Sequence, residues 1–393
     1  MNSAIALAAG LTLIFATSAI PCAVRADTSS FRITALPICT SQPASGAGCR
    51  GVPDFDVAEA NRRLAGQAFT YWVDGTVLRM AARTRDATPP RLCCSFQDYM
   101  KPLGQQGAES LWGAQYDLPH LDQSILTLSL AGTVQTAAHQ YRGPNAPAAA
   151  VGVTSLKGHL ETIDINSENL GETRKVTLYT PAAPPPQGGY PVIYIADGMS
   201  VTSFAPRVEK LIDDGKISPV LLIGIWSSDR RPDATHRFDG RSNEYMPDAG
   251  FDPISYAHHE QFVLNEVMPL AETRYHASTY RDRRLTFGYS NGASWAIAFA
   301  TRHADLFAQG SGMAAGMDAA SLSFAGVPKG FQLFVGAGEY DLLRYSTYSI
   351  CDKARGSGLK CRYVPLYTGH DPAMWDYGLE QALVCFFHPS PFN

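Results

Sequence analysis

The chain has 393 residues, 45% of them hydrophobic and 17% charged, and a formal net charge of −4 at pH 7. The hydrophobic share is sufficient for a folded core, which excludes a disordered chain, and the length favours one large or two unequal domains. The mildly acidic balance and the lack of a long basic run argue against a nucleic-acid partner.

Residues 1–26 have the pattern of a secretory signal segment. Residues 4–15 are largely apolar, and Val24 and Ala26 place small residues at a cleavage site, although the usual positive charges before the apolar stretch are missing. Polar residues and Pro21 interrupt the apolar stretch, which makes it too short to span a bilayer comfortably. We therefore predict a periplasmic or secreted protein without a membrane span.

Residues 27–140 contain several short strand-like runs and no helical pattern between them. The runs at 69–73 and 76–80 flank an Asp-Gly pair at Asp74, which predicts a hairpin. Two further runs of the same kind lie at residues 91–96 and 124–130. Short strands in succession are typical of a small β-sandwich, which we predict for this N-terminal domain.

A segment rich in Pro, Ala and Gly at residues 141–151 predicts a linker to a second domain, residues 152–393. In this second domain, a helical pattern at 256–274 and other helical stretches separate strand-like runs. These runs lie at residues 175–179, 191–195, 220–225, 284–288 and 331–335. Alternation of strands and helices predicts an α/β domain with a parallel sheet covered by helices.

The cysteines fit an exported protein. Cys39 and Cys49, and likewise Cys351 and Cys361, each enclose a short Gly-containing segment, which predicts two local disulfides in an oxidising compartment. No spacing of cysteines matches a zinc site, and we predict neither a metal nor an organic cofactor. The sequence leaves open the pairing of Cys93, Cys94 and Cys385.

Residues 288–292, Gly-Tyr-Ser-Asn-Gly, match the nucleophile-elbow pattern G-x-S-x-G. The pattern lies between a predicted strand and a helical stretch at 293–302, as a sharp strand-to-helix turn requires. Gly288 and Gly292 would avoid clashes in that turn, and Ser290 would be exposed at the carboxyl edge of the sheet. The pattern therefore predicts Ser290 as a nucleophile.

A serine nucleophile needs a base within hydrogen-bond reach, and in this type of fold the base follows the serine along the chain. Three histidines follow Ser290. His303 falls in the helix after the elbow and His388 in a Pro-rich tail, whereas His370 lies in a turn after a strand-like run. We predict His370 as the general base.

The acid of the triad should lie between the serine and the histidine in sequence. Glu339 and Asp341 follow the strand at 331–335, and both qualify. The oxyanion of the tetrahedral intermediate needs hydrogen-bond donors. We predict the backbone N–H of Asn291, next to the nucleophile, and that of Gly198, in the loop after the strand at 191–195.

These residues resemble the family of α/β-hydrolases that includes the enterochelin esterases and esterase D. The resemblance covers roughly residues 155–388. It is carried by the hairpin at 158–180, Asp197-Gly198, the elbow at 287–292, and Gly369-His370-Asp371 with Trp375 and Leu379. The resemblance implies an α/β-hydrolase fold with a smaller N-terminal β-sandwich.

The resemblance also implies roles for single residues. Relatives tend to carry a Glu shortly after a Gly in the acid loop, which favours Glu339 over Asp341. The segment around Arg241 resembles one near the pocket mouth, so Arg241 would bind substrate, with a surface ion pair as an equal alternative. We also assign Trp375 to substrate binding. Ala293 departs from the family, in which many members have a second glycine after the elbow.

The sequence thus predicts a serine carboxylesterase that works through an acyl-enzyme. The resemblance suggests a siderophore trilactone as substrate, and four arginines could bind an anionic ferric catecholate: Arg230, Arg231, Arg237 and Arg241. One alternative is an acetyl or feruloyl esterase of polysaccharides, with residues 27–140 as a sugar-binding module. Another is a hydrolase-like binding protein without activity, against which Ser290 and His370 argue.

Overall fold

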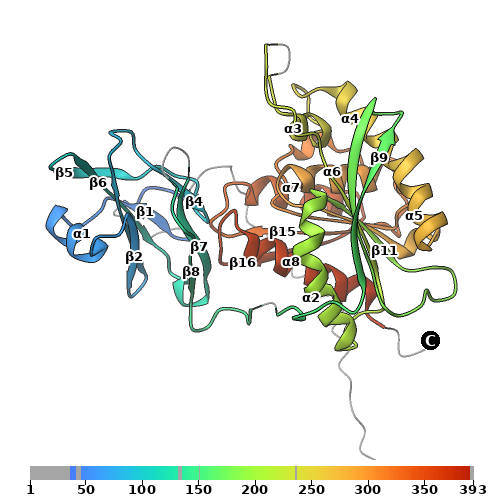
Figure 1. Cartoon of the computed structure of the whole chain (residues 1–393), viewed down its shortest axis with the longest axis horizontal. Helices are drawn as coiled ribbons and strands as arrows, with labels where there is room; N and C mark the ends of the chain where they lie inside the picture. Colours follow the sequence, from blue (N-terminus) through green and yellow to red (C-terminus); the bar gives the residue numbers. More distant parts are fainter. Residues whose placement is uncertain (1–35, 41–45, 132–134, 150, 235–236, 390–393) are drawn as a thin grey trace, which may run out of the picture.

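The computed structural model describes residues 36–40, 46–131, 135–149, 151–234 and 237–389. The predicted signal segment, residues 1–26, lies outside these residues. Figure 1 shows two bodies side by side, a smaller one built from the N-terminal strands and a larger one in which strands and helices alternate. No helix in the described part of the chain is long and apolar enough to cross a membrane.

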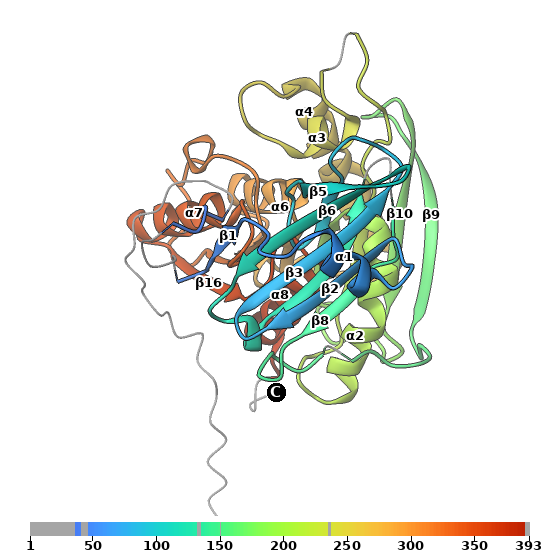
Figure 2. The same cartoon turned by 90° about the vertical axis from the view of Figure 1, so that its left-hand side faces the viewer.

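The N-terminal body contains two antiparallel sheets. Its elements are β1 (Cys49–Gly51), α1 (Val57–Leu64), β2 (Phe69–Asp74), β3 (Val77–Thr84), β4 (Arg91–Cys94), β5 (Lys101–Gln106), β6 (Glu109–Asp117), η1 (Leu121–Gln123), β7 (Ile125–Ala131) and β8 (His139–Arg142). One sheet has the order β1-β6-β3-β2 with β5 beside β6, and the other has the order β4-β7-β8. Figure 2 shows the first sheet from outside, with α1 lying across it.

The two N-terminal sheets share one apolar core, as the β-sandwich prediction requires. Leu78 and Met80 of β3 pack in the same cluster as Leu126 and Leu128 of β7. The predicted hairpin is present, with Val73 of β2 paired to Leu78 of β3. Helix α1 was not predicted.

The larger body holds an eight-stranded sheet and its helices. Its elements are β9 (His159–Ser167), β10 (Glu172–Thr180), β11 (Val192–Ala196), η2 (Gly198–Ser200), α2 (Val201–Asp213), β12 (Leu221–Ile225), α3 (Gly240–Tyr245), α4 (Pro253–Phe262), η3 (Val263–Val267), α5 (Met268–Tyr275), η4 (Arg281–Arg283), β13 (Arg284–Phe287), α6 (Asn291–Arg302), β14 (Gln309–Met313), η5 (Ala319–Ser321), β15 (Gln332–Gly338), α7 (Arg344–Gly356), β16 (Lys360–Leu366) and α8 (Pro372–Phe387).

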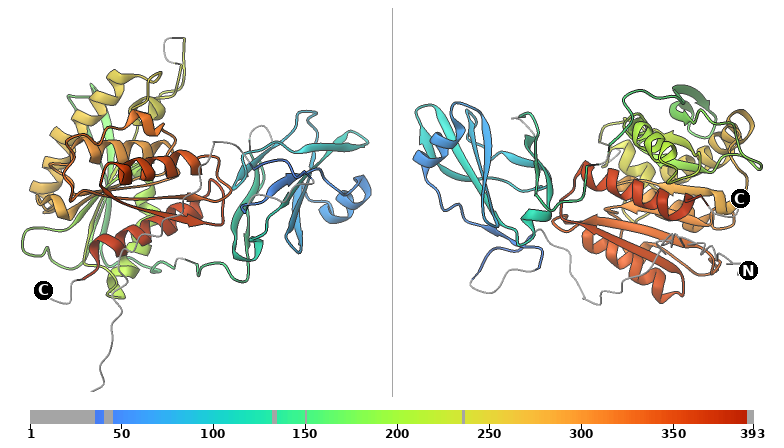
Figure 3. Two further views of the ribbon diagram at one scale, coloured as in Figure 1. Left: turned by 180° about the vertical axis from the view of Figure 1, so that it is seen from behind. Right: turned by 90° about the horizontal axis from the view of Figure 1, so that it is seen from below.

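The large sheet has the order β16-β15-β14-β13-β11-β12-β10-β9. Strands β9 and β10 run antiparallel to their neighbours, and β11 to β16 are parallel. The apolar runs of β11 and β12 are buried throughout, because helices cover both faces of the sheet (Figure 3). One face packs on α2 and α8, the other on α4 to α7. This is the predicted α/β-hydrolase fold.

The two predicted local disulfides are present, Cys39–Cys49 in the N-terminal body and Cys351–Cys361 between α7 and β16. Cys93 and Cys94, whose pairing the sequence left open, form a disulfide between neighbouring residues at the end of β4. Cys385 is disulfide-bonded as well.

Candidate active site

Ser290 lies in a sharp turn between β13 and α6. Its backbone has φ 55° and ψ −131°, a conformation that residues other than glycine rarely adopt and that is typical of a nucleophile elbow. A Cβ on Gly288 would lie 2.2 Å from the carbonyl oxygen of Gly292, and one on Gly292 would lie 2.9 Å from Cβ of Ala196. Both glycines are therefore needed for this turn.

Ala293, the departure from the family pattern, is fully buried in α6. A Cβ on Gly312 of β14 would lie only 2.9 Å from Cβ of Ala293. Gly312 thus leaves the space that the methyl group of Ala293 occupies, and the elbow packs tightly without a second glycine.

His370 lies in the loop between β16 and α8, and its partner is Asp341. The distance from His370 Nδ1 to Asp341 Oδ2 is 2.9 Å, and Asp341 Oδ1 accepts a hydrogen bond of 2.8 Å from the Leu343 N–H. The Asp341 side chain is fully buried, whereas that of His370 is 17% exposed. A buried carboxylate on Nδ1 leaves Nε2 as the exposed ring nitrogen that can accept a proton.

The prediction that favoured Glu339 as partner of His370 is corrected by this contact. Strand β15 ends at Gly338, and the chain then turns, with the Asp341 N–H bonded to the Gly338 carbonyl oxygen at 3.0 Å. Glu339 is still paired with the neighbouring strand, since its N–H bonds to the carbonyl oxygen of Leu366 at 2.8 Å. The turn therefore directs Asp341, two residues later, toward the histidine loop.

Trp375 of α8 lies between the elbow and the histidine. Its ring stacks on Tyr289 at a centroid distance of 5.0 Å and meets the His370 ring edge-on at 4.9 Å. Trp375 is only 8% exposed, so this position suits support of the His370 ring more than contact with a substrate.

No hydrogen bond joins Ser290 Oγ to the His370 ring among the described residues, and such bonds often tighten only when substrate binds.

The two predicted oxyanion donors lie at the carboxyl edge of the large sheet. Asn291 is the first residue of α6, so its N–H has no acceptor within the helix and lies at the positive end of the helix dipole. Gly198 follows β11, the strand next to β13. A Cβ on Gly198 would lie 2.4 Å from the Gly224 carbonyl oxygen, so close packing on β12 requires this glycine.

Arg241 contacts the loop after β11, which carries Gly198, one of the predicted oxyanion donors. Its Nε and Nη2 atoms donate to the two carboxylate oxygens of Asp197 at 2.6 and 2.7 Å, and Nη2 also reaches the Tyr289 carbonyl oxygen at 3.4 Å. Burial disfavours the charge of Arg241, but the hydrogen bond and charge of Asp197 outweigh it and raise its pKa. Arg241 was predicted to bind substrate, with a surface ion pair as the alternative. The structure pairs it with the buried Asp197, and substrate contact stays a prediction.

Asp197, whose role the sequence did not reveal, anchors the start of the loop after β11. It has φ 56°, in the left-handed region, and is 4% exposed. Its N–H donates to the Tyr245 hydroxyl at 2.9 Å, and that hydroxyl donates to the Ile225 carbonyl oxygen at 3.2 Å. The Asp-Gly pair was recognised in the sequence, but only its glycine was given a role.

The other predicted arginines lie on the segment between β12 and α3. Arg231 and Arg237 are exposed, and the Arg237 guanidinium lies 5.0 Å from the centre of the Phe238 ring. Arg230 is half-buried. This segment starts at the carboxyl end of β12, the same edge of the sheet as Ser290.

In the described part of the chain, no group of three or more His, Cys, Asp or Glu could hold a metal ion.

The sequence of residues 167–382 matches the family described as "Putative esterase". The chain belongs to this esterase family. Among solved structures, the enterobactin esterase FES from Shigella flexneri is similar, with a TM-score of 0.59 and 14% identity over 82% of this chain and 97% of that one. The ferric enterobactin esterase from Salmonella typhimurium has a TM-score of 0.56 and 13% identity, over 81% and 96% of the two chains. No curated protein matches this chain in sequence.

Proposed function

We propose that this esterase is a serine carboxylesterase that forms an acyl-enzyme on Ser290. The observation that supports it most is the combination of a serine in the strained elbow conformation with the His370–Asp341 pair on the neighbouring loops. Family membership and fold both agree with ester hydrolysis, but the nucleophile is inferred from this geometry.

In the proposed reaction, His370 Nε2 takes the proton of Ser290 Oγ while Oγ attacks the ester carbonyl carbon. The N–H groups of Asn291 and Gly198 would stabilise the negative oxygen of the tetrahedral intermediate. His370 then gives its proton to the leaving alcohol, and the acyl-enzyme remains. A water molecule, deprotonated by His370, attacks the acyl carbon, and the acid leaves as Ser290 regains its proton.

We further propose that the substrate is a catecholate trilactone and that the protein acts in the periplasm or outside the cell. The similar solved structures are named as enterobactin esterases, and Arg231 and Arg237 are exposed cations on the segment that follows β12. Export agrees with the disulfides Cys39–Cys49 and Cys351–Cys361, since such bonds persist in oxidising compartments.

A panel of three substrates tests the proposal: a short-chain chromogenic ester, a catecholate trilactone and an acetylated or feruloylated xylan. Wild-type protein should hydrolyse the first two, and Ser290→Ala neither, while the control Ser323→Ala, on an exposed loop, keeps full activity. Hydrolysis of the xylan ester in preference to the trilactone would support a polysaccharide esterase. If the wild type cleaves none of the three, the binding-protein alternative is favoured.

A further inference from the structure

Asp371, next to the proposed catalytic histidine, is a fully buried carboxylate that forms the N-cap of α8. Its Oδ2 accepts hydrogen bonds from Ser95 Oγ at 2.6 Å and from the Thr127 N–H at 2.8 Å. Its Oδ1 accepts from Thr127 Oγ1 at 3.2 Å and from the Ala373 N–H at 2.8 Å. Three of these four donors belong to the N-terminal sandwich and only one to the helix that Asp371 caps.

The rest of the histidine loop also lies against the sandwich. A Cβ on Gly369 would lie 1.5 Å from the Ser95 carbonyl oxygen, so only a glycine permits this approach. Also before His370, the Ile125 N–H donates to the Tyr367 carbonyl oxygen at 3.0 Å, whereas Asp371 makes its sandwich contacts after the histidine. The loop is therefore held by the sandwich both before and after the histidine.

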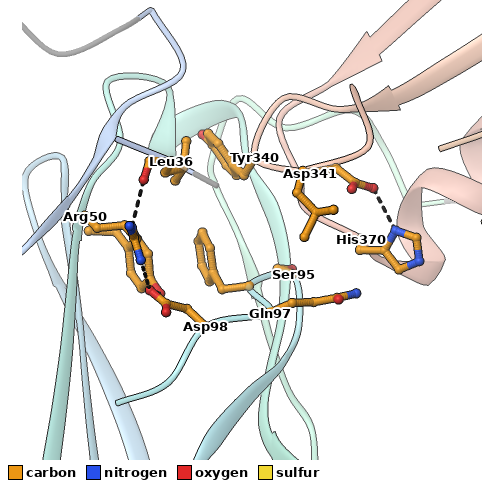
Figure 4. A pocket seen from close by; sticks show the side chains of 11 residues that line it. Leu36, Arg50, Ser95, Gln97, Asp98, Tyr340, Asp341 and His370 are labelled. Atoms are coloured by element: carbon orange, nitrogen blue, oxygen red, sulfur yellow. Dashed lines mark hydrogen bonds and ion pairs between the residues drawn. The ribbon is translucent and has the colours of Figure 1, made fainter. Parts of the chain in front are cut away.

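The loop that carries the triad acid has a similar contact. The Tyr340 hydroxyl, one residue before Asp341, shares a hydrogen bond of 2.8 Å with Ser124 Oγ, and its ring stacks on Phe96. Figure 4 shows the pocket between the two bodies, with Ser95 on the sandwich side and the Asp341–His370 pair on the other. The loop that carries His370 and the loop that carries Asp341 therefore both contact the N-terminal sandwich.

A buried carboxylate is stable only where donors replace its hydration, and here the sandwich supplies most of them. We propose that Ser95 and Thr127 are positioning residues for the catalytic base, and that they act through Asp371. The N-terminal sandwich is then a structural part of the esterase site rather than a separate sugar-binding module. This inference rests on the serine-esterase function proposed above.

Asp371→Asn separates the two duties of this residue. The amide oxygen can still accept a hydrogen bond from the Ala373 N–H and cap α8. The amide NH2 group, however, is a donor and cannot accept the hydrogen bonds that Ser95 and Thr127 donate. Ser95→Ala removes one donor and leaves the cap unchanged. The matched control is Asp252→Asn, which changes the N-cap of α4, away from the sandwich.

Small displacements of a catalytic group cost up to about a hundredfold in rate. With a short-chain chromogenic ester, Asp371→Asn and Ser95→Ala should lower kcat by about ten- to a hundredfold, with KM unchanged within about twofold. The pH dependence of kcat/KM should shift as well, since it reports the ionisation of the base in the free enzyme. Asp252→Asn should leave kcat, KM and the pH profile as in the wild type.

Proton NMR provides a readout that needs no turnover. The hydrogen bond between His370 Nδ1 and Asp341 should give a low-field resonance, identified by its loss in Asp341→Asn. This resonance should persist in Asp252→Asn and be displaced or lost in Asp371→Asn and Ser95→Ala. If the wild type hydrolyses no ester, the proposed function fails, while this resonance still decides whether the sandwich positions His370.

Two results would overturn the inference. One is that Ser95→Ala and Asp371→Asn leave the kinetics, the pH profile and the resonance as in the wild type. The other is that they lower the melting temperature but leave the kcat, pH profile and resonance of the folded protein unchanged, which would make Asp371 a structural cap alone. If Asp371→Asn does not fold, Ser95→Ala decides between these outcomes.

Discussion

Replacing Asp341 by asparagine should abolish most of the activity while changing little else in the structure. The amide oxygen of Asn can keep the hydrogen bond that Asp341 Oδ1 accepts from the Leu343 N–H at 2.8 Å. The amide NH2 group then faces Nδ1 of His370, which must become an acceptor. The ring proton moves to Nε2, the nitrogen that has to take the proton of Ser290.

A base in the wrong tautomer cannot accept a proton, and the loss of the buried charge also destabilises the imidazolium that forms during the reaction. Such a change costs about 10⁴-fold in kcat, equivalent to about 5.5 kcal/mol in the activation free energy. Because the Asp341 side chain is fully buried, solvent cannot replace the missing charge. KM should change much less than kcat.

The assay is steady-state hydrolysis of a chromogenic ester, with Glu339→Gln as the matched control. Glu339 lies at the end of β15 rather than on the His370 ring, so its amide variant should retain kcat within about tenfold. Circular dichroism and thermal melting confirm that both variants are folded. If Glu339→Gln is the more damaging change, Glu339 is the acid and the argument from the turn after β15 is wrong.

Three further predictions concern other parts of the molecule. Arg241→Lys should lower kcat by about tenfold with little change in KM, because a lysine cannot make both hydrogen bonds to Asp197. A raised KM with unchanged kcat would instead indicate that Arg241 contacts substrate. Removing the Cys351–Cys361 disulfide by a double alanine substitution should lower the free energy of unfolding by about 2–3 kcal/mol, measured by urea denaturation; unchanged stability contradicts this. Burial lowers the pKa of His259 to about 3 from its ordinary 6.5, so between these values only the unfolded chain gains a proton and stability falls as the pH falls. His259→Phe should flatten this acid dependence, and an unchanged slope in acid denaturation would refute it.

Much of the larger body could be predicted because its strands are buried on both faces. Such strands must be apolar throughout, and β11 and β12 are therefore recognisable as short uninterrupted runs. The helical pattern at 256–274 was likewise correct, although the structure contains a π-helical turn, Val263–Val267, within it. A local pattern of apolar spacing does not distinguish α from π hydrogen bonding.

The candidate site divides into local and long-range features. Ser290 and His370 could be proposed because each lies in a short motif whose geometry depends on adjacent residues. The choice between Glu339 and Asp341 depends on how the chain turns after β15. The sequence shows two carboxylates on one loop but not the direction in which each side chain points. The hydrogen bond of Ser95 to Asp371 joins residues 276 positions apart, and no local sequence pattern predicts it.

Labelling with a fluorophosphonate, which reacts with activated serines, tests the central claim most directly. Peptide mass spectrometry of the labelled protein should find one adduct per chain, on Ser290, and hydrolysis of the chromogenic ester should disappear in proportion to labelling. Asp341→Asn should label far more slowly, since its base has the wrong tautomer. An adduct on another residue, or hydrolysis that persists after Ser290 is fully modified, would contradict the assignment of Ser290 as the nucleophile.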